Sequence, residues 1–224
     1  MDLFKSIDGE IFVFHTGMEP AQLDRHIKVE SMTSEEIRRL RLCNVDLTET
    51  FLPLNTFEEV LEHLKNKCIL NLDRSIKILD DVMKIVNKHN MADQVLLKSD
   101  PSDASLKMVE TFAPKVDYMP IFMEEDVASE KIENMNINYI GAELVFKSES
   151  SSIAQDSYID MMHKKGRILW GNSIVYSSRV PLAAGHNDDI SLTGDPEDGW
   201  GWLAKKGFDI IQTDWTHHCV NYLR

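Results

Sequence analysis

The sequence predicts an α/β protein whose parallel strands close into a barrel, and two observations carry that prediction. Short apolar runs alternate with stretches in which apolar residues recur every three or four positions, as on one face of a helix. No linker or low-complexity segment divides the 224 residues. Repeated strand–helix units imply a parallel sheet covered on both faces, and roughly six units in one domain favour a closed barrel. No GxGxxG follows a strand, which argues against a dinucleotide-binding fold.

Each predicted strand is a short apolar run, and each predicted helix follows one. The expected strands lie at 69–73, 94–98, 116–122, 137–146, 167–170 and 208–211. The expected helices lie at about 76–86, 100–112, 127–135, 156–165 and 200–206. The acidic segment from Pro181 to Asp198 is expected to be a long loop, and long loops in compact domains tend to be functional.

The first third of the chain has a different pattern. Asp8 and Gly9 lie between two short apolar runs and predict a hairpin turn. The spacing Thr-x-x-Glu occurs at 33–36 and again at 56–59, and it is typical of a capping box at the start of a helix. The first of these helices is expected to run to about Cys43.

Charge and composition exclude some classes of function. A formal net charge of -13 without a basic stripe argues against a nucleic-acid-binding surface. No apolar run is long enough to anchor the chain in a membrane, and no signal peptide is visible. The chain is therefore expected to be cytoplasmic, or secreted if the natural protein extends further upstream. Three cysteines lack metal or disulfide spacing and are expected to be reduced and mostly buried: Cys43, Cys68 and Cys219.

Several segments, in order along the chain, resemble one enzyme family. Residues 1–15 are similar to a segment with Glu-x-Asp, a hairpin turn and a strand ending in His-Asp. Residues 70–75 fall where that family has a strand ending in Glu-x-Lys, and 207–214 resemble its closing Gly-x-Asp-x-Ile-x-Thr-Asp. Weaker similarities lie between them, at 34–40, 52–61, 95–99, 113–116 and 167–172. The family is that of the glycerophosphodiester phosphodiesterases, and the resemblance covers essentially the whole chain.

This resemblance implies a TIM-type (β/α) barrel, formed as a single domain by residues 1–224, with its active site at the carboxyl ends of the strands. The implied reaction is hydrolysis of a small-molecule glycerophosphodiester to glycerol 3-phosphate and an alcohol. The implied cofactor is a divalent cation, Mg²⁺ or Ca²⁺, held by oxygen ligands. The resemblance does not indicate an oligomeric state.

The resemblance places metal ligands and a proton-transfer residue. Asp2 matches the metal-binding Asp of Glu-x-Asp, and its alternative interpretation is a solvated terminal carboxylate. Asp73 replaces a metal-binding Glu, and it is alternatively the N-cap of the helix that follows. His15 matches the His of His-Asp and is expected to act as a general acid or base, although Thr16 stands where the family has Asp.

Substrate-binding residues are expected on other strands. Ser75 stands in place of a phosphate-facing Lys, and Lys98 at the next strand end is expected to supply the missing charge, unless it is an ordinary solvent-exposed lysine. Glu143 lies in an apolar strand and faces either the barrel mouth or a solvent edge. Trp170, and less clearly Asn172, either lines the pocket or packs within the barrel.

The chain departs from the family pattern in one large respect. No His-Arg-Gly occurs in it, so the first β/α unit is expected to be absent, together with a second His, an Arg and one metal ligand. The alternative function is that of a catalytically impaired relative that binds a phosphorylated ligand or a protein partner. A second possible metal group is His186 with Asp188 and Asp189. His217 and His218 are expected to be structural.

Overall fold

The computed structural model describes residues 1–175 and 179–224, which form two compact units. The N-terminal unit contains residues 1–99 and 104–117, and the C-terminal unit contains 100–103 and 118–224. In the part of the chain that the structure describes, no helix is both long and apolar enough to cross a membrane.

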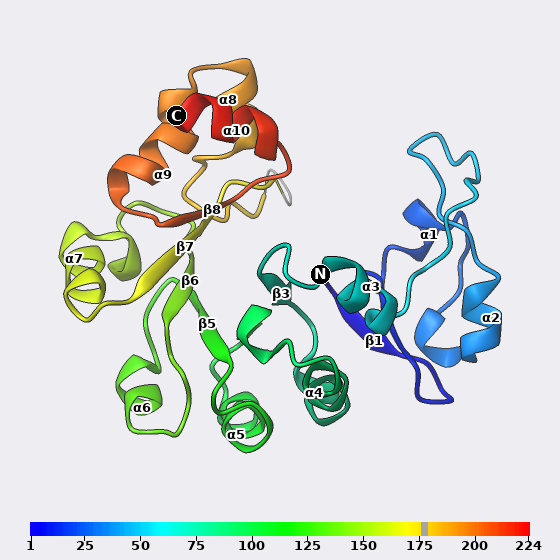
Figure 1. Ribbon diagram of the computed structural model, residues 1–224. Coiled ribbons are helices and arrows are strands. Elements are labelled where there is room, and N and C mark those ends of the chain that lie inside the picture. Colours follow the sequence, from blue (N-terminus) through cyan, green and yellow to red (C-terminus); the bar gives the residue numbers. More distant parts are fainter. Residues whose placement is uncertain (176–178) are drawn as a thin grey trace. The chain divides into compact units, whose positions relative to one another are not determined.

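The chain begins with an antiparallel hairpin of β1 (Leu3–Lys5) and β2 (Ile11–Val13), as predicted (Figure 1). Gly9 in its turn has a φ of 98°, which a residue without a side chain adopts at no steric cost. The hairpin and the helices after it enclose a small apolar core, formed by Phe4, Phe12, Phe14, Leu23, Val29, Ile37, Leu40 and Leu54.

Four short helices follow the hairpin in the N-terminal unit. They are α1 (Glu19–Gln22), the 3₁₀ helix η1 (Val29–Ser31), α2 (Ser34–Arg38) and α3 (Phe57–Leu64). Both predicted capping boxes are present, at the starts of α2 and α3. The prediction that the first of these helices reaches about Cys43 is wrong. It ends at Arg38 because Leu42 pairs with an extended segment instead, with N–O distances of 2.9 Å to Leu52 and 2.8 Å to Thr50.

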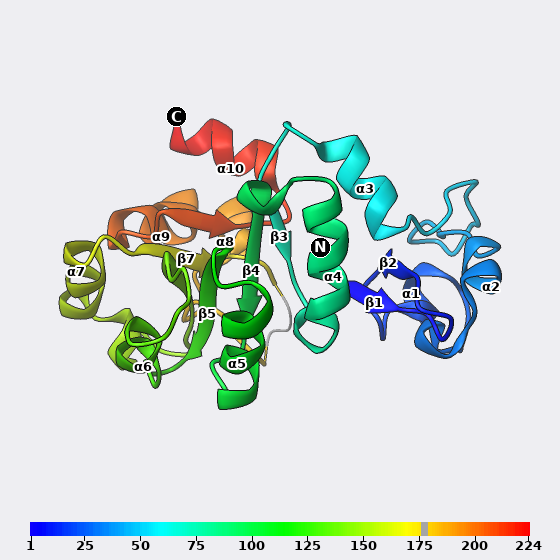
Figure 2. The same ribbon diagram turned by 60° about the horizontal axis from the view of Figure 1, so that its bottom comes forward.

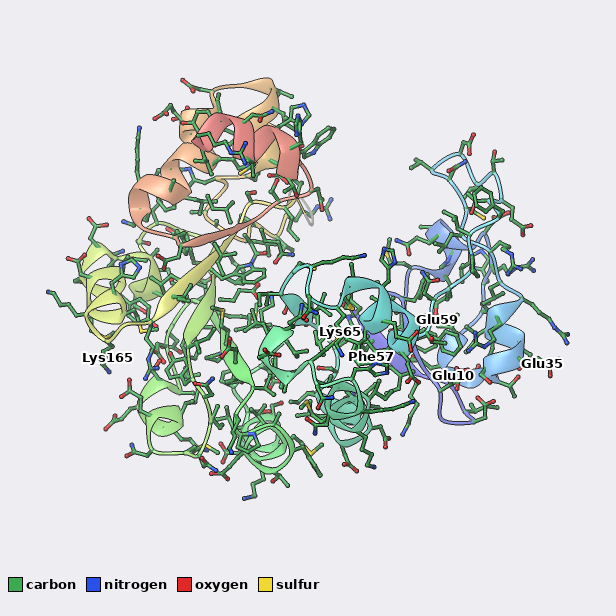
Figure 3. The ribbon with its side chains drawn as sticks, in the orientation of Figure 1. Glu10, Glu35, Phe57, Glu59, Lys65 and Lys165 are labelled. Atoms are coloured by element: carbon green, nitrogen blue, oxygen red, sulfur yellow. The ribbon has the colours of Figure 1, made fainter. Side chains whose placement is uncertain are left out.

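An arginine joins α2 to the hairpin and to α3. Arg38 contacts Glu10 at 2.5 Å and Glu59 at 3.5 Å. Both carboxylates are labelled in Figure 3, where they lie close together in the N-terminal unit. Partly exposed ion pairs of this kind add little stability, so the contacts mainly hold these elements in register.

Asp8 ties the hairpin turn to the start of α2. Its carboxylate accepts hydrogen bonds from the Ser6 hydroxyl at 2.6 Å, the Ser34 hydroxyl at 2.7 Å and the Ser34 N–H at 2.8 Å. The hydroxyl of Ser6, followed by the two donors of Ser34, lowers the pKa of Asp8 from its usual 3.8 to about 2. These bonds favour the charged form, so they favour folding only while Asp8 is ionised.

We therefore expect the benefit of Asp8 to be complete above pH 4 and to disappear as the pH falls towards 2. Asp8→Asn should melt below the wild type at pH 6, and this difference should narrow between pH 4 and pH 2. Thermal melts across that range measure it, with exposed Asp93→Asn as the matched control. A gap in melting temperature that stays constant down to pH 2 would contradict the assignment.

Two parallel strands complete the N-terminal unit. They are β3 (Leu70–Leu72) and β4 (Val95–Ser99), with Leu72 opposite Leu97. The crossover between them contains η2 (Ile76–Ile78), α4 (Leu79–Lys88) and η3 (Ala92–Gln94), and α5 (Asp103–Phe112) follows β4. Figure 2 shows α4 running beside the two strands. Its buried residues recur at the predicted helical spacing, namely Leu79, Val82, Met83 and Val86.

The C-terminal unit is built on four parallel strands in sequential order. They are β5 (Asp117–Met123), β6 (Gly141–Val145), β7 (Ile168–Asn172) and β8 (Ile210–Gln212). The helices that alternate with them are α6 (Ser129–Glu133), η4 (Ser152–Ala154), α7 (Asp156–Lys164) and α9 (Trp200–Lys206), and α10 (Thr216–Leu223) ends the chain. In Figure 1, α6 and α7 lie on the same side of the strands. The predicted alternation of strand and helix is confirmed.

Two sequence expectations need correction. The segment from Pro181 to Asp198 is not simply a loop, because it contains α8 (Asp188–Thr193) and η5 (Pro196–Asp198). Asn187 is the N-cap of α8, and its side chain accepts a hydrogen bond from the Ile190 N–H. Asp195 is the N-cap of η5, and its side chain accepts a hydrogen bond from the Glu197 N–H. The cysteines are free, as expected, and Cys219 is buried, but Cys68 is exposed.

Candidate active site

Two carboxylates lie side by side in the N-terminal unit. Asp2 immediately precedes β1, Asp73 immediately follows β3, and the two residues form a parallel β-bridge. The Leu3 N–H donates to the Asp73 carbonyl at 3.2 Å, which holds the two segments together. The side chains of Asp2 and Asp73 are 26% and 35% exposed, so both can reach a ligand from solvent.

Asp73 does not cap the helix that follows it. Its Oδ1 accepts the N–H of Arg74 at 3.1 Å, and neither η2 nor α4 has a side-chain cap. The alternative interpretation of Asp73 as an N-cap is therefore wrong, and its Oδ2 faces Lys98 at 4.0 Å.

Two cationic side chains accompany these carboxylates. Lys98 lies at the penultimate position of β4, and its side chain is only 1% exposed, so it is not an ordinary solvent-exposed lysine. Arg74 lies on the outer side, with Nε 3.4 Å from Asp2 Oδ1 and with its side chain 47% exposed. Sequence reasoning missed Arg74 because the family pattern directs attention to the next position, Ser75.

Ser75 is turned away from solvent. It is 1% exposed, and its hydroxyl donates to the Leu72 carbonyl at 3.3 Å. A buried serine in this position offers no positive charge to a ligand.

His15 follows β2 directly after Phe14, and its two neighbours connect it to the same cluster. The Phe14 N–H donates to the Asp2 carbonyl at 3.0 Å, and Arg74 Nη1 donates to the Thr16 carbonyl at 3.1 Å. The His15 ring is half-buried, and its Nδ1 is buried without a hydrogen-bond partner among the described residues. A buried polar atom without a partner is rare in a purely structural side chain.

The four predicted residues Asp2, His15, Asp73 and Lys98 thus lie in one unit, with Arg74 among them. The carboxylates suit a hard divalent cation, because Mg²⁺ keeps several water ligands and is often held by only one or two protein carboxylates. The predicted metal ligands therefore fit such an ion by donor type and by their adjacent placement.

Glu143 and Trp170 belong to a second group, in the C-terminal unit. They are directly opposite each other on β6 and β7. Glu143 is 6% exposed and accepts from Asn172 Nδ2 at 2.5 Å, so the solvent-edge interpretation is wrong. Trp170 Nε1 donates to Gln212 Oε1 at 3.1 Å. Both remain proposed substrate-binding residues.

The second possible metal group is committed to structural contacts. His186 uses both ring nitrogens, at 2.5 Å from the Asp198 carbonyl and 2.9 Å from Glu149, and its ring stacks on Trp202 at 3.8 Å. Asp188 is 2% exposed and accepts several hydrogen bonds. These contacts do not support a metal site there.

The C-terminal histidines lie on α10. His217 Nε2 lies 3.1 Å from the side-chain amide nitrogen of Asn221, one turn further along the same helix. His218 is in edge contact with Trp215. Both residues are exposed, and these local contacts agree with the structural role expected for them.

Sequence analysis did not identify one further group of possible metal ligands. Glu58, Glu62 and His89 place one ligand atom each within 4.8 Å of one another. The spacing of Glu58 and Glu62, four residues apart on α3, is a signal that could have found it. Glu58 already contacts Lys88 at 2.5 Å and His89 at 2.7 Å, so the group is a local network of ion pairs.

Comparisons with known proteins agree with the sequence resemblance. A family model described as a domain of unknown function, DUF4996, matches residues 118–223, slightly less than half of the chain. No curated protein matches the sequence.

Solved structures with a similar fold cover the whole chain. A glycerophosphoryl diester phosphodiesterase from Parabacteroides distasonis is 18% identical with a TM-score of 0.75, over 100% of this chain and 74% of that one. A glycerophosphodiester phosphodiesterase from Thermotoga maritima is 19% identical with a TM-score of 0.67, over 100% of this chain and 83% of that one.

A phosphodiesterase from Oleispira antarctica was solved in complex with its product, sn-glycerol-3-phosphate. It is 13% identical with a TM-score of 0.64, over 99% of this chain and 83% of that one. At these identities the likeness establishes the fold, and the predicted barrel-type α/β class is confirmed. The chain has the fold of the glycerophosphodiester phosphodiesterases.

Proposed function

We propose that this chain carries the activity of a cation-assisted phosphodiesterase, which hydrolyses glycerophosphodiesters to glycerol 3-phosphate and an alcohol. The observation that carries the proposal is the cluster of Asp2, Asp73 and His15 within this fold. The complex of the Oleispira antarctica enzyme with glycerol 3-phosphate supports the substrate class. Such an activity belongs to the breakdown of lipid-derived diesters, and we expect it in the cytoplasm.

In this proposal Asp2 and Asp73 hold Mg²⁺ or Ca²⁺, whose charge neutralises the phosphate and favours the departing oxygen. His15 transfers a proton as general acid or base. Since its Nδ1 is buried without a hydrogen-bond partner among the described residues, Nε2 is the ring nitrogen that exchanges protons with the ligand. Lys98 contributes positive charge from beneath Asp73.

The second candidate is a protein that binds a phosphorylated ligand without turning it over. The replacement of the family's phosphate-facing lysine by the buried Ser75 favours it.

Release of glycerol 3-phosphate separates the two candidates. We expect release from glycerophosphocholine or glycerophosphoethanolamine with Mg²⁺ or Ca²⁺ and none in EDTA. We expect Asp73→Asn to reduce the rate about 100-fold, because a neutral amide holds a hard cation poorly. Asp93→Asn, an exposed site in the same unit, should leave it unchanged. Binding of glycerol 3-phosphate without turnover under every condition would favour the second candidate.

A further inference from the structure

Arg74 occupies a conformation that stability alone does not explain. Its φ is 52°, in the left-handed region that non-glycine residues seldom adopt. Its ion pair with Asp2 is half-exposed, and such pairs contribute little to folding. Strained backbone conformations persist mainly where the surrounding structure uses them, and they cluster at ligand-binding sites.

The left-handed turn has a definite result for the neighbouring side chains. It buries Ser75 against Leu72 and leaves the guanidinium of Arg74 beside the Asp2 carboxylate. The contacts described for that guanidinium use Nε, towards Asp2, and Nη1, towards the Thr16 carbonyl at 3.1 Å and its hydroxyl at 3.4 Å. Among the described residues Nη2 has no partner. The guanidinium can therefore donate from Nη2 to another anion while Nε and Nη1 keep their contacts.

We propose that Arg74 binds the phosphate group of the substrate, and that it provides the positive charge missing at Ser75 from one position earlier. The proposal rests on the function proposed above and names a residue that the family pattern does not indicate. Lys98 lies deeper, 1% exposed beneath Asp73, whereas Arg74 is on the side open to solvent. The guanidinium of Arg74 is always charged, and its Nη2 can donate to a phosphate oxygen while Nε and Nη1 keep their contacts with Asp2 and Thr16.

Binding measured by calorimetry in EDTA tests Arg74 independently of catalysis. The probes are inorganic phosphate and sn-glycerol 3-phosphate. Arg74→Asn is the main variant, because asparagine tolerates the left-handed conformation and should preserve the turn. We expect about 10-fold weaker binding of both probes, with partial recovery in Arg74→Lys. Lys77→Ala, an exposed cation three residues away, is the matched control and should bind as the wild type does.

Titration with Mg²⁺ or Ca²⁺ distinguishes ligand binding from a structural role. Because Arg74 competes with a cation for Asp2, the cation affinity of Arg74→Asn should be unchanged or higher. If Arg74→Asn binds phosphate as well as the wild type, or loses cation affinity together with phosphate affinity, the assignment of Arg74 is wrong. If the wild type binds neither probe and releases no glycerol 3-phosphate, the proposed function falls as well. Release by the wild type with unchanged binding in Arg74→Asn overturns only the assignment of Arg74.

Discussion

Replacing Asp188 with alanine should lower the free energy of unfolding by about 3 kcal/mol, because it leaves several buried donors without an acceptor. Asp188 is 2% exposed. It accepts from the Ser173 hydroxyl at 2.6 Å, Trp200 Nε1 at 2.7 Å, the Thr213 hydroxyl at 2.7 Å and the Asp214 N–H at 2.9 Å. These donors come from the segments after β7 and β8 and from α9, so one carboxylate joins them all.

Urea denaturation followed by circular dichroism measures the effect. Asp189→Ala is the matched control, since Asp189 is the next residue of α8 and is exposed. We expect the free energy of unfolding of this control to lie within about 0.5 kcal/mol of the wild-type value. The free energy of unfolding of Asp188→Asn should lie between those of Asp188→Ala and Asp189→Ala. The amide keeps one acceptor oxygen but places an NH₂ group among donors. Equal unfolding midpoints for Asp188→Ala and Asp189→Ala would show that the network contributes nothing to stability.

His15→Ala should produce the largest loss of activity, about 1,000-fold in kcat, because general acid–base catalysis typically accounts for between 100-fold and 10,000-fold of the rate. The variant should bind glycerol 3-phosphate nearly as well as the wild type, because the positive charges proposed to attract the phosphate belong to Arg74 and Lys98. Rates of glycerol 3-phosphate release at saturating substrate, together with binding by calorimetry, measure both effects.

His26→Ala is the control for His15, since His26 is an exposed histidine of the same unit. It should retain full activity. Full activity in His15→Ala would rule out His15 as the proton-transfer residue. Loss of binding in proportion to the loss of rate would instead indicate a role in holding the ligand.

Elements with long or well-capped patterns were predictable from the sequence. α4 has buried residues at positions 79, 82, 83 and 86, so its periodicity is strong. The hairpin at Asp8 and Gly9 and both capping boxes are local signals, which depend on a few neighbouring residues. α8 is only six residues long and starts at a polar cap, so it carries too few apolar positions to show a period. The end of α2 depends on the pairing of Leu42 with Thr50 and Leu52, eight and ten positions later, which no local pattern reveals.

The candidate site was predictable where it follows a strand end. Asp2, His15, Asp73 and Lys98 all lie at or beside strand ends. The resemblance named the first three, and Lys98 was inferred from its place at the end of the next strand. Arg74 could not be found in this way, since its orientation depends on a backbone φ of 52° that the sequence does not indicate. The hydrogen bonds of Asp188 could not be predicted either, because their donors lie far from it in the sequence, on both sides.

Two cationic side chains, Arg74 and Lys98, face the carboxylates of Asp2 and Asp73. A phosphodiester anion that entered alone would add negative charge beside Asp2 and Asp73 within a chain of net charge -13, and a divalent cation alone would add positive charge beside Arg74 and Lys98. Taken up together, the two ions offset part of each other's charge. Binding of the cation and binding of the substrate are therefore thermodynamically linked, and by reciprocity each raises the affinity for the other by the same factor.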